Sequence, residues 1–176
     1  MIKIILALTT ISHQTAIPVI DIHDWVLPSY GSAMVFEIKR NGKKIGIHQV
    51  DFKTNNEQLS IESKTKIRVK FLFFNAYKFD YNSLEKWKNG ELVSLLSTTN
   101  DNGKKSTVNL ASGTDIINVT INDDTHVNSL DDLKYTTNHW NPNVLAAKQV
   151  LNTITGKSNQ FQITQAESNL VSTGSG

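Results

Sequence analysis

The longest regular pattern in the chain is an alternation of apolar and polar positions from Leu59 to Phe73. Successive side chains of a β-strand point to opposite faces, so this pattern predicts a long strand with one buried and one solvated face. Strands usually have about five or six residues, and this greater length favours a curved sheet that wraps a core or an apolar ligand. The buried face includes Ile67, Val69 and Phe71. The solvated face is a basic row of Lys64, Lys66, Arg68 and Lys70.

Tight turns separate this segment from similar ones. Asn41-Gly42, Asn89-Gly90 and Asn102-Gly103 each lie between alternating segments, and Asn-Gly accepts the positive φ angles of a two-residue hairpin turn. Asn55-Asn56 can do the same with more strain. Consecutive hairpins predict an antiparallel meander. Its expected strands are Met34–Lys39, Ile45–Lys53, Leu59–Phe73, Tyr77–Trp87, Glu91–Thr99, Lys104–Leu110 and Ile116–Ile121.

Two segments depart from simple alternation. Between Ile45 and Phe52 the apolar residues change parity, which predicts a β-bulge near Gly46 or Ile47. After Ile121 the chain is polar until Asn141-Pro142, a pair that favours the start of a helix.

The apolar residues after this pair have helical spacing and predict a helix from Pro142 to Thr155, ended by Gly156. Phe161–Thr164 is a candidate last strand, and Pro18–Ser32 is expected to be a lead-in or an edge strand. We therefore predict a mostly β fold. It is a single curved antiparallel sheet or half-barrel of about seven to nine strands, with one C-terminal helix packed on it.

Composition limits the function classes. The chain has 176 residues, of which 39% are hydrophobic and 19% charged, which indicates one globular domain. Its net charge of +2 is too small to indicate nucleic-acid binding. The absence of cysteine excludes disulfides, cysteine-ligated zinc, iron–sulfur clusters and thiol nucleophiles.

The N-terminus has the pattern of an export signal. Met1 to Lys3 is a short positive start, Ile4 to Ile11 is apolar, and small or polar residues follow up to Ala16. The apolar run is too short for a membrane-spanning helix, and no other stretch is long enough. We expect a signal peptide at 1–16, a single β domain at 17–166 and a flexible tail at 167–176, in a periplasmic or secreted protein. The alternative is that 1–16 forms a first strand.

Glu85 is the first candidate for chemistry. It shares one face of its predicted strand with four aromatic residues, so burial is expected to raise the pKa of its carboxyl group. The alternative is that Glu85 only satisfies neighbouring polar groups of the fold. The aromatic residues are Tyr77, Phe79, Tyr81 and Trp87.

His48 is the second candidate, because Val50 and Phe52 on the same face are apolar and predict that it is at least half buried. With Glu85 it would form an acid/base couple, whereas a neutral histidine can also rest in a core. His139 and Trp140 precede the predicted helix, and Trp140 is expected to act as a hydrophobic lid.

No metal site or cofactor is expected. Asp21-Ile22-His23-Asp24 offers ligand types without a second histidine at a zinc spacing. Asn100-Asp101-Asn102-Gly103 lacks the later glutamate of a calcium loop and is predicted to be a hairpin turn. Phosphate-binding glycine motifs and the G-x-S-x-G nucleophile motif are also absent from the sequence.

The order of these motifs resembles a family of small exported bacterial β-rich proteins of unassigned function. The resemblance covers Val35 to Lys157, and its most specific element is Glu85-x-Trp87-x-x-Gly90-x-Leu92. More distantly, the layout is similar to the half-barrel of lipoprotein carriers, which hold acyl chains against a concave apolar face.

Three hypotheses follow. The first is a non-enzymatic protein that binds an apolar, lipid-like ligand in its concave face. The second is a hydrolase or isomerase that uses Glu85 with His48 or a tyrosine. The third is an interaction module that binds anionic lipid or polysaccharide through its basic row. The ligand-binding residues expected under the first hypothesis are His48, Ile67, Val69, Phe71, Tyr77, Phe79, Tyr81, Glu85, Trp87 and Trp140.

Overall fold

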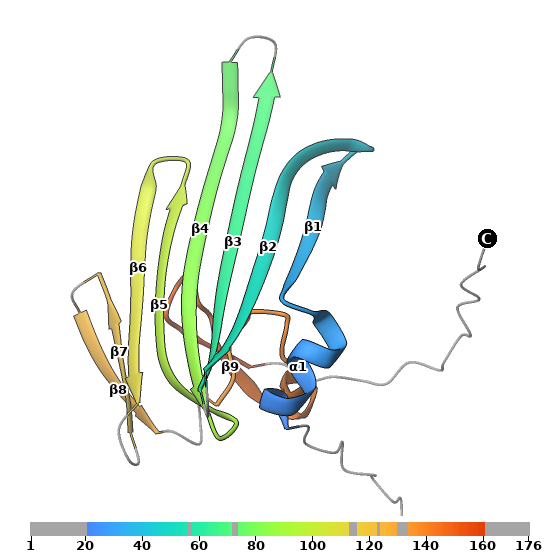
Figure 1. Cartoon of the computed structure of the whole chain (residues 1–176). Helices are drawn as coiled ribbons and strands as arrows, with labels where there is room; N and C mark the ends of the chain where they lie inside the picture. The colour runs from blue at the N-terminus through green and yellow to red at the C-terminus, as the bar shows by residue number, and fades with distance from the viewer. Residues whose placement is uncertain are drawn as a thin grey trace, which may run out of the picture.

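A computed structural model describes residues 21–55, 58–71, 74–112, 116–122, 124–129 and 134–160. One helix, α1 (Ile22–Tyr30), precedes a sheet of eight antiparallel strands whose spatial order follows the sequence (Figure 1). The strands are β1 (Ala33–Arg40), β2 (Lys43–Asn55), β3 (Gln58–Phe71), β4 (Phe74–Lys88), β5 (Glu91–Asp101), β6 (Lys104–Ser112), β7 (Ile116–Ile121) and β8 (Asp124–Ser129). The meander and its first seven strands are therefore confirmed.

The three Asn-Gly turns have the predicted backbone. Asn41, Asn89 and Asn102 have φ values of 51°, 52° and 51°, and the glycine that follows each one also has a positive φ. Two consecutive positive φ values match the right-handed twist of the flanking strands. In the last of these turns the Asn100 side chain accepts a hydrogen bond from Gly103 N at 2.9 Å, so this segment is a hairpin turn as predicted.

The predicted bulge lies in β2. Ile38 of β1 pairs with Gly46 and Lys39 pairs with Lys44, so Ile45 is the extra residue. Gly46 also has a packing reason to be glycine, because a Cβ there would lie 2.3 Å from the Lys66 carbonyl oxygen of β3. The parity change in the sequence therefore identified a real irregularity of the sheet.

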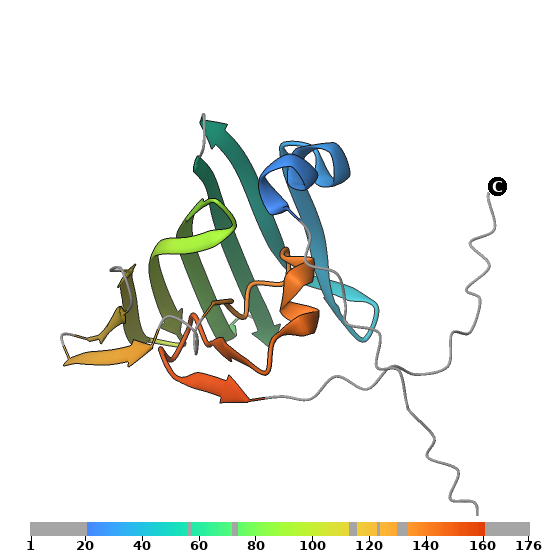
Figure 2. The ribbon, with the colours of Figure 1, turned by 90° about the horizontal axis from the view of Figure 1, so that it is seen from below.

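The sheet curves, and a C-terminal stretch lies inside the curve. Residues 134–160, which we call the cover segment, cross the concave face near the lower end of the strands (Figure 2). The cover segment contains a short 3-10 helix, η2 (Pro142–Ala146), and two short paired strands, β9 (Gln149–Leu151) and β10 (Ser158–Gln160). The core between sheet and cover segment contains the buried side chains of Ile61, Trp87, Leu95, Trp140 and Leu151.

The predicted C-terminal helix is wrong in extent. Asn141 does cap a helix, since its side chain accepts from Asn143 N at 3.0 Å, but the 3-10 helix ends at Ala146. Leu151 is buried whereas Leu145 and Ile154 are exposed, so these residues share no apolar face. Leu151 instead donates to the Tyr135 carbonyl at 2.8 Å and accepts from Thr137 N at 2.9 Å. Extended pairing satisfies the backbone here and outweighs the helical spacing.

The α-helix of the fold lies at the N-terminal side. Pro18–Ser32 was expected to be a lead-in or an edge strand, but Ile22–Tyr30 is helical. Asp21 caps this helix by accepting from His23 N at 3.0 Å, and Gly31 ends it with a φ of 69°. Ile22 and Val26, one turn apart, are buried against the sheet, which explains why this short segment is ordered as a helix.

The number of strands differs from the prediction, and several predicted segments lie outside the described residues. With β9 and β10 the described residues contain ten strands, more than the seven to nine expected, and β8 lies in the polar stretch that gave no strand pattern. The sheet is open between β1 and β8. The predicted leader (1–16), the Asn55-Asn56 turn, the strand Phe161–Thr164 and the tail (167–176) lie outside the described residues, wholly or in part.

Candidate ligand-binding site

The concave face has a covered lower part and an open upper part. Strand register aligns side chains in rows across the sheet, because paired residues point to the same face. The lower rows, at the level of Trp87, Glu85 and Ser83, are buried beneath the cover segment. The cover segment also reaches the row of Tyr81 and Ser106. Above that row, Ile67 and Phe79 are half-buried.

Glu85 is at the centre of the covered part. Its side chain has no exposed surface, and both carboxyl oxygens accept two hydrogen bonds. Oε1 accepts from Thr136 Oγ1 at 2.7 Å and from Asn138 Nδ2 at 2.6 Å. Oε2 accepts from the indole nitrogens of Trp87 at 2.9 Å and Trp140 at 3.0 Å. Three of these four donors belong to the cover segment, so Glu85 fixes that segment to the sheet.

Burial raises the pKa of Glu85, as the sequence predicted. The four hydrogen bonds act in the opposite direction because they stabilise the charged form. A carboxylate that accepts from four donors has little capacity left for a substrate or a water molecule. The geometry therefore supports the alternative interpretation, in which Glu85 satisfies polar groups of the fold.

Tyr81 adds a second set of contacts to the cover segment. Its hydroxyl donates to Asn138 Oδ1 at 3.1 Å and is hydrogen-bonded to Thr153 Oγ1 at 2.7 Å, and burial raises its pKa. Ser97 of β5 also donates to the Thr153 carbonyl. Together with the Glu85 contacts and the bond from Ser106 of β6 to the Ile154 carbonyl, these bonds close the lower concave face over β4, β5 and β6.

A pocket remains at the side of the cover segment nearest to β1. It has a volume of about 360 Å³ and lies next to the Trp140 ring. We call it the His48 pocket. Its lining is mostly apolar and contains two histidines: Tyr30, Met34, Phe36, His48, Val50, His139 and Trp140.

His48 is held in a defined orientation in this pocket. Its Nδ1 is 2.8 Å from Thr65 Oγ1, and its ring stacks on Phe36 with centroids 6.0 Å apart. This leaves Nε2 as the second polar atom of the ring. Burial lowers the pKa of His48, and repulsion from His139 lowers it further. The pocket thus presents a neutral imidazole on an apolar wall.

The open apolar row lies directly above the His48 pocket. Register aligns Ile38 of β1, Gly46 of β2, Ile67 of β3 and Phe79 of β4. Gly46 adds no side chain to this row, and the Ile67 side chain packs close beside it. All four residues are half-buried on the same concave face as His48. The row and the pocket therefore lie at adjacent levels of β1 and β2 on the concave face.

The sequence grouped residues that the fold separates. Trp87 and Trp140 were expected to contact a ligand, and of these Trp140 lines the His48 pocket while Trp87 lies in the closed core. Val69 and Tyr77 pair at the half-buried upper end of the sheet, and the side chain of Phe71 lies outside the described part.

His48 and Glu85 share the concave face without meeting. They are two strands and four residues apart in register, which corresponds to roughly 16 Å. Their hydrogen bonds go to different partners, Thr65 for His48 and the cover segment or Trp87 for Glu85. The geometry therefore does not bring the two members of the predicted acid/base couple together.

Sequence reasoning missed several residues of both sites. Thr136 and Asn138 come from a polar stretch without periodicity, so nothing in the sequence connected them to Glu85, and Thr153 lies in the segment that was predicted to be a helix. Met34 and Phe36 alternate with Val35 and Glu37, and this alternation could have indicated a second apolar face beside His48.

The basic row of β3 lies on the convex face as predicted. Two of its four members are in ion pairs, Lys64 with Glu62 at 2.6 Å and Arg68 with Asp80. Lys66 and Lys70 are exposed and have no ion-pair partner in the part of the chain that the structure describes. Only two of the four basic side chains in this row are therefore without a neutralising carboxylate among the described residues.

Two kinds of feature are absent from the described residues. No group of three or more His, Asp or Glu side chains is placed to hold a metal ion in the described ranges. No described helix has the length and apolar character needed to cross a membrane.

These features define an open, curved antiparallel sheet with a partly covered concave face and an apolar pocket at one side. The chain belongs to the family DUF6134, a domain of unknown function, whose model matches residues 36–176. The match begins within β1 and includes the Glu85 element and the cover segment. No curated protein and no solved structure shows a significant match to the chain.

Proposed function

We propose that the protein binds an amphipathic, lipid-like molecule in the His48 pocket and along the open apolar row, without converting it. The supporting observation is the pocket of about 360 Å³, walled by Met34, Phe36 and Trp140 and supplied with one oriented histidine. Ligand pockets are typically apolar concavities of about 300–1,000 Å³ with a few placed polar groups. This pocket is at the small end of that range and suits a single acyl chain.

The position of the pocket gives the ligand a direction. An acyl chain that enters beside Trp140 can continue along Ile38, Ile67 and Phe79, whose half-buried side chains lose further exposed surface when covered. Each CH₂ group buried in this way contributes about 0.8 kcal/mol. His48 Nε2 provides a hydrogen-bonding atom for the polar end of the ligand.

A brominated fatty acid tests this proposal directly. Bromine quenches tryptophan fluorescence on contact, and Trp140 forms part of the pocket wall, so saturable quenching is expected. Native mass spectrometry of the full chain, purified gently, should also show a lipid-sized mass adduct. A chain that is neither quenched nor found with an adduct contradicts the proposal.

Two neighbouring residues provide a matched pair of variants. Phe36 and Val35 are adjacent in β1 and are 50% and 62% exposed, but Phe36 lines the pocket while Val35 lies on the opposite face. Phe36→Ser is expected to weaken quenching about tenfold or more, because it removes an apolar wall. Val35→Ser should leave quenching unchanged. Equal effects of the two variants would contradict a site on the concave face.

We also propose export to the periplasm or the medium. The support is the pattern of the first sixteen residues, with a positive start and a short apolar run. Expression of the full chain in a bacterial host, followed by fractionation and mass measurement, tests it. Introducing Asp at Leu8 within the apolar run should retain the protein in the cytoplasm with an unshortened N-terminus.

A further inference from the structure

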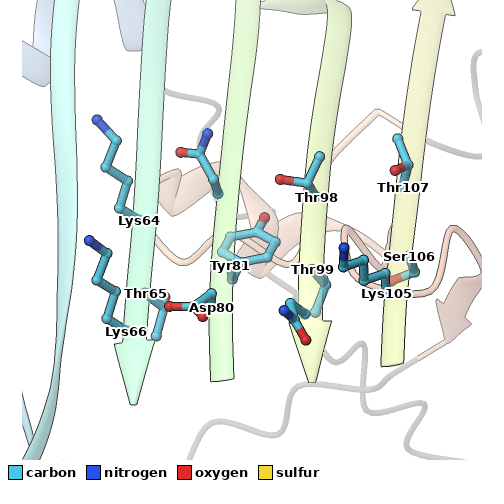
Figure 3. Close-up of a pocket in the computed structure, with 12 residues that line it drawn as sticks. Lys64, Thr65, Lys66, Asp80, Tyr81, Thr98, Thr99, Lys105, Ser106 and Thr107 are labelled. Carbon is cyan, nitrogen blue, oxygen red and sulfur yellow. The ribbon is translucent and has the colours of Figure 1, made fainter. Parts of the chain in front are cut away.

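The convex face of the sheet contains a connected set of hollows that the concave ligand site does not use. The first, of about 380 Å³, lies over β3 to β6, with Lys64 and Lys66 on one flank and Lys105 on the other (Figure 3). The second, of about 460 Å³, lies over β2 and β3 and shares Lys64 and Lys66 with the first. The third, of about 620 Å³, reaches the β1–β2 turn and shares Lys44 and Arg68 with the second.

Positive charge is concentrated along these hollows. Asp80 is the one carboxylate among the residues that line them, and Arg68 and Lys78 pair with it. The net charge of the whole chain is only +2, so this accumulation is local. Eight lining residues are cations: Arg40, Lys43, Lys44, Lys64, Lys66, Arg68, Lys70 and Lys105.

Neutral hydrogen-bonding side chains form an ordered row in the first hollow. Register places Lys64 opposite Asn82, Asn82 opposite Thr98, and Thr98 opposite Thr107, so one polar side chain follows at each strand. Asn82, Thr98 and Thr107 are exposed. A row with a spacing of about 4.8 Å can donate to and accept from the successive hydroxyl groups of a sugar chain.

The two exposed cations of this hollow are far apart. Lys66 and Lys105 lie in the same register row, separated by β4 and β5, which corresponds to about 14 Å. Neither has an ion-pair partner among the residues that the structure describes. A single small anion cannot contact both, whereas a polymer with repeated negative groups can. Asp80, which pairs with Arg68, and Asn100 lie between them in this row, and the exposed amide and hydroxyl groups of the adjacent row (Asn82, Thr98 and Thr107) suit a polysaccharide.

The shape of this face disfavours a lipid bilayer as its partner. The sheet is curved (Figure 2), and the hollows lie on its outer side, so a flat membrane would contact only the most protruding strands. Between the cations of the first hollow the lining side chains on this face are polar, and exposed apolar side chains of the convex face, such as Ile47, Leu84 and Leu96, lie outside that hollow. From charge, spacing and shape together we propose that the convex face binds a linear anionic polysaccharide across β2 to β6.

Polygalacturonate, a linear polymer with one carboxylate per sugar, is a suitable probe, with uncharged dextran as its neutral counterpart. The full chain should be retarded by polygalacturonate in affinity electrophoresis and not by dextran. Binding should weaken as salt is raised, because exposed charges are screened. Failure to bind polygalacturonate at low salt overturns the proposal.

Charge variants locate the site. The double variant Lys66→Gln/Lys105→Gln is expected to lower the affinity for polygalacturonate about tenfold, because each substitution removes one exposed ion pair between the protein and a carboxylate of the polymer. The control is the double variant Lys53→Gln/Lys86→Gln, which removes the same amount of charge from exposed positions of the convex face outside the hollows. It should change the affinity for polygalacturonate by less than about twofold. Equal losses in the two double variants would indicate unspecific attraction and overturn the proposal.

An uncharged variant tests the polar row. Thr98→Val with Thr107→Val keeps charge and strand propensity and removes two hydroxyl groups, so a loss of about threefold or more supports the sugar contacts. An unchanged affinity for polygalacturonate would overturn the proposed contacts between the polar row and the sugar hydroxyl groups. Vesicles of equimolar phosphatidylglycerol and phosphatidylcholine complete the test, since tighter binding to vesicles than to polygalacturonate would make a membrane the partner instead. All these convex-face variants are expected to leave unchanged the quenching of tryptophan fluorescence by the brominated fatty acid.

Discussion

Trp140 donates its indole hydrogen to Glu85 Oε2 at 3.0 Å across 55 residues of sequence. This bond joins the cover segment to the central strand β4. The same oxygen accepts from Trp87 of β4, and the two indole rings meet edge to face with centroids 5.3 Å apart. A strand residue and a cover residue are thus held on one buried carboxylate, and this arrangement closes the lower part of the concave face.

Replacing Glu85 by glutamine should destabilise the protein. Glutamine has one acceptor oxygen, so its amide group would face either the two indole donors or Thr136 and Asn138. Buried donors without an acceptor have a cost of about 1–3 kcal/mol each. We expect Glu85→Gln to lower the free energy of unfolding by about 3 kcal/mol, measured by urea denaturation.

Glu62→Gln is the matched control for this change. Glu62 lies one residue from Ile61 on the convex face and pairs with Lys64 at the surface. Surface pairs contribute about 0–1 kcal/mol, so its loss should be small. A Glu85→Gln variant as stable as Glu62→Gln would show that the four hydrogen bonds do not hold the fold together.

Tyr81→Phe should loosen the cover segment without unfolding the sheet. The change removes the hydroxyl that bonds Thr153 and Asn138 and keeps the ring, so a loss of about 1–2 kcal/mol is expected. Hydrogen exchange should accelerate at the amide of Thr153 more than in the strands β3 and β4. Tyr30→Phe keeps the stacking of that ring on Phe52 and serves as control. Uniform acceleration over sheet and cover segment would contradict this prediction.

The sheet could be predicted because its signals are local. Alternation defines the faces of β3, and Asn-Gly turns fix the hairpins around β4 and β5, so strand order follows without knowledge of distant contacts. The change of parity beside Gly46 even indicated the bulge. These features depend on residues that are close together in sequence.

The cover segment could not be predicted because its conformation depends on distant partners. Val144, Leu145, Leu151 and Ile154 have helical spacing, yet the segment is mostly extended where its backbone pairs with Tyr135 and Thr137. Thr136 and Asn138 lie in a polar stretch, and only the folded sheet brings them to Glu85. The same limit applies to the His48 pocket, whose wall combines α1, β1, β2 and the cover segment.

Gly46→Ala should be among the most damaging single-methyl changes in the sheet. The added carbon would lie 2.3 Å from the Lys66 carbonyl and 3.1 Å from the Ile67 side chain, so β2 and β3 would have to separate. Overpacking of this kind has a cost of about 1–3 kcal/mol. Thermal or urea denaturation measures the loss.

Gly90→Ala separates this packing effect from backbone strain. Gly90 has a φ of 78° and nothing within 4 Å of its added Cβ, so only the conformational cost applies, about 1 kcal/mol. A Gly46→Ala variant that is no less stable than Gly90→Ala would argue against the close approach of β2 and β3.

His48 should make stability depend on pH below neutrality. Its pKa is lowered in the folded protein by burial and by His139, so the folded state binds the proton less readily than the unfolded chain, in which histidine titrates near pH 6.5. The contribution is fully present above about pH 6.5, the value of the unfolded chain, and is lost progressively as the pH falls below it. Urea denaturation at pH 7.5 and pH 5.0 should show this loss in the unmodified chain. His48→Gln, whose amide can still reach Thr65, should reduce the difference between the two pH values, and His23→Gln in α1 should retain it. If the pH dependence is the same with and without His48, protonation of this pocket does not govern stability.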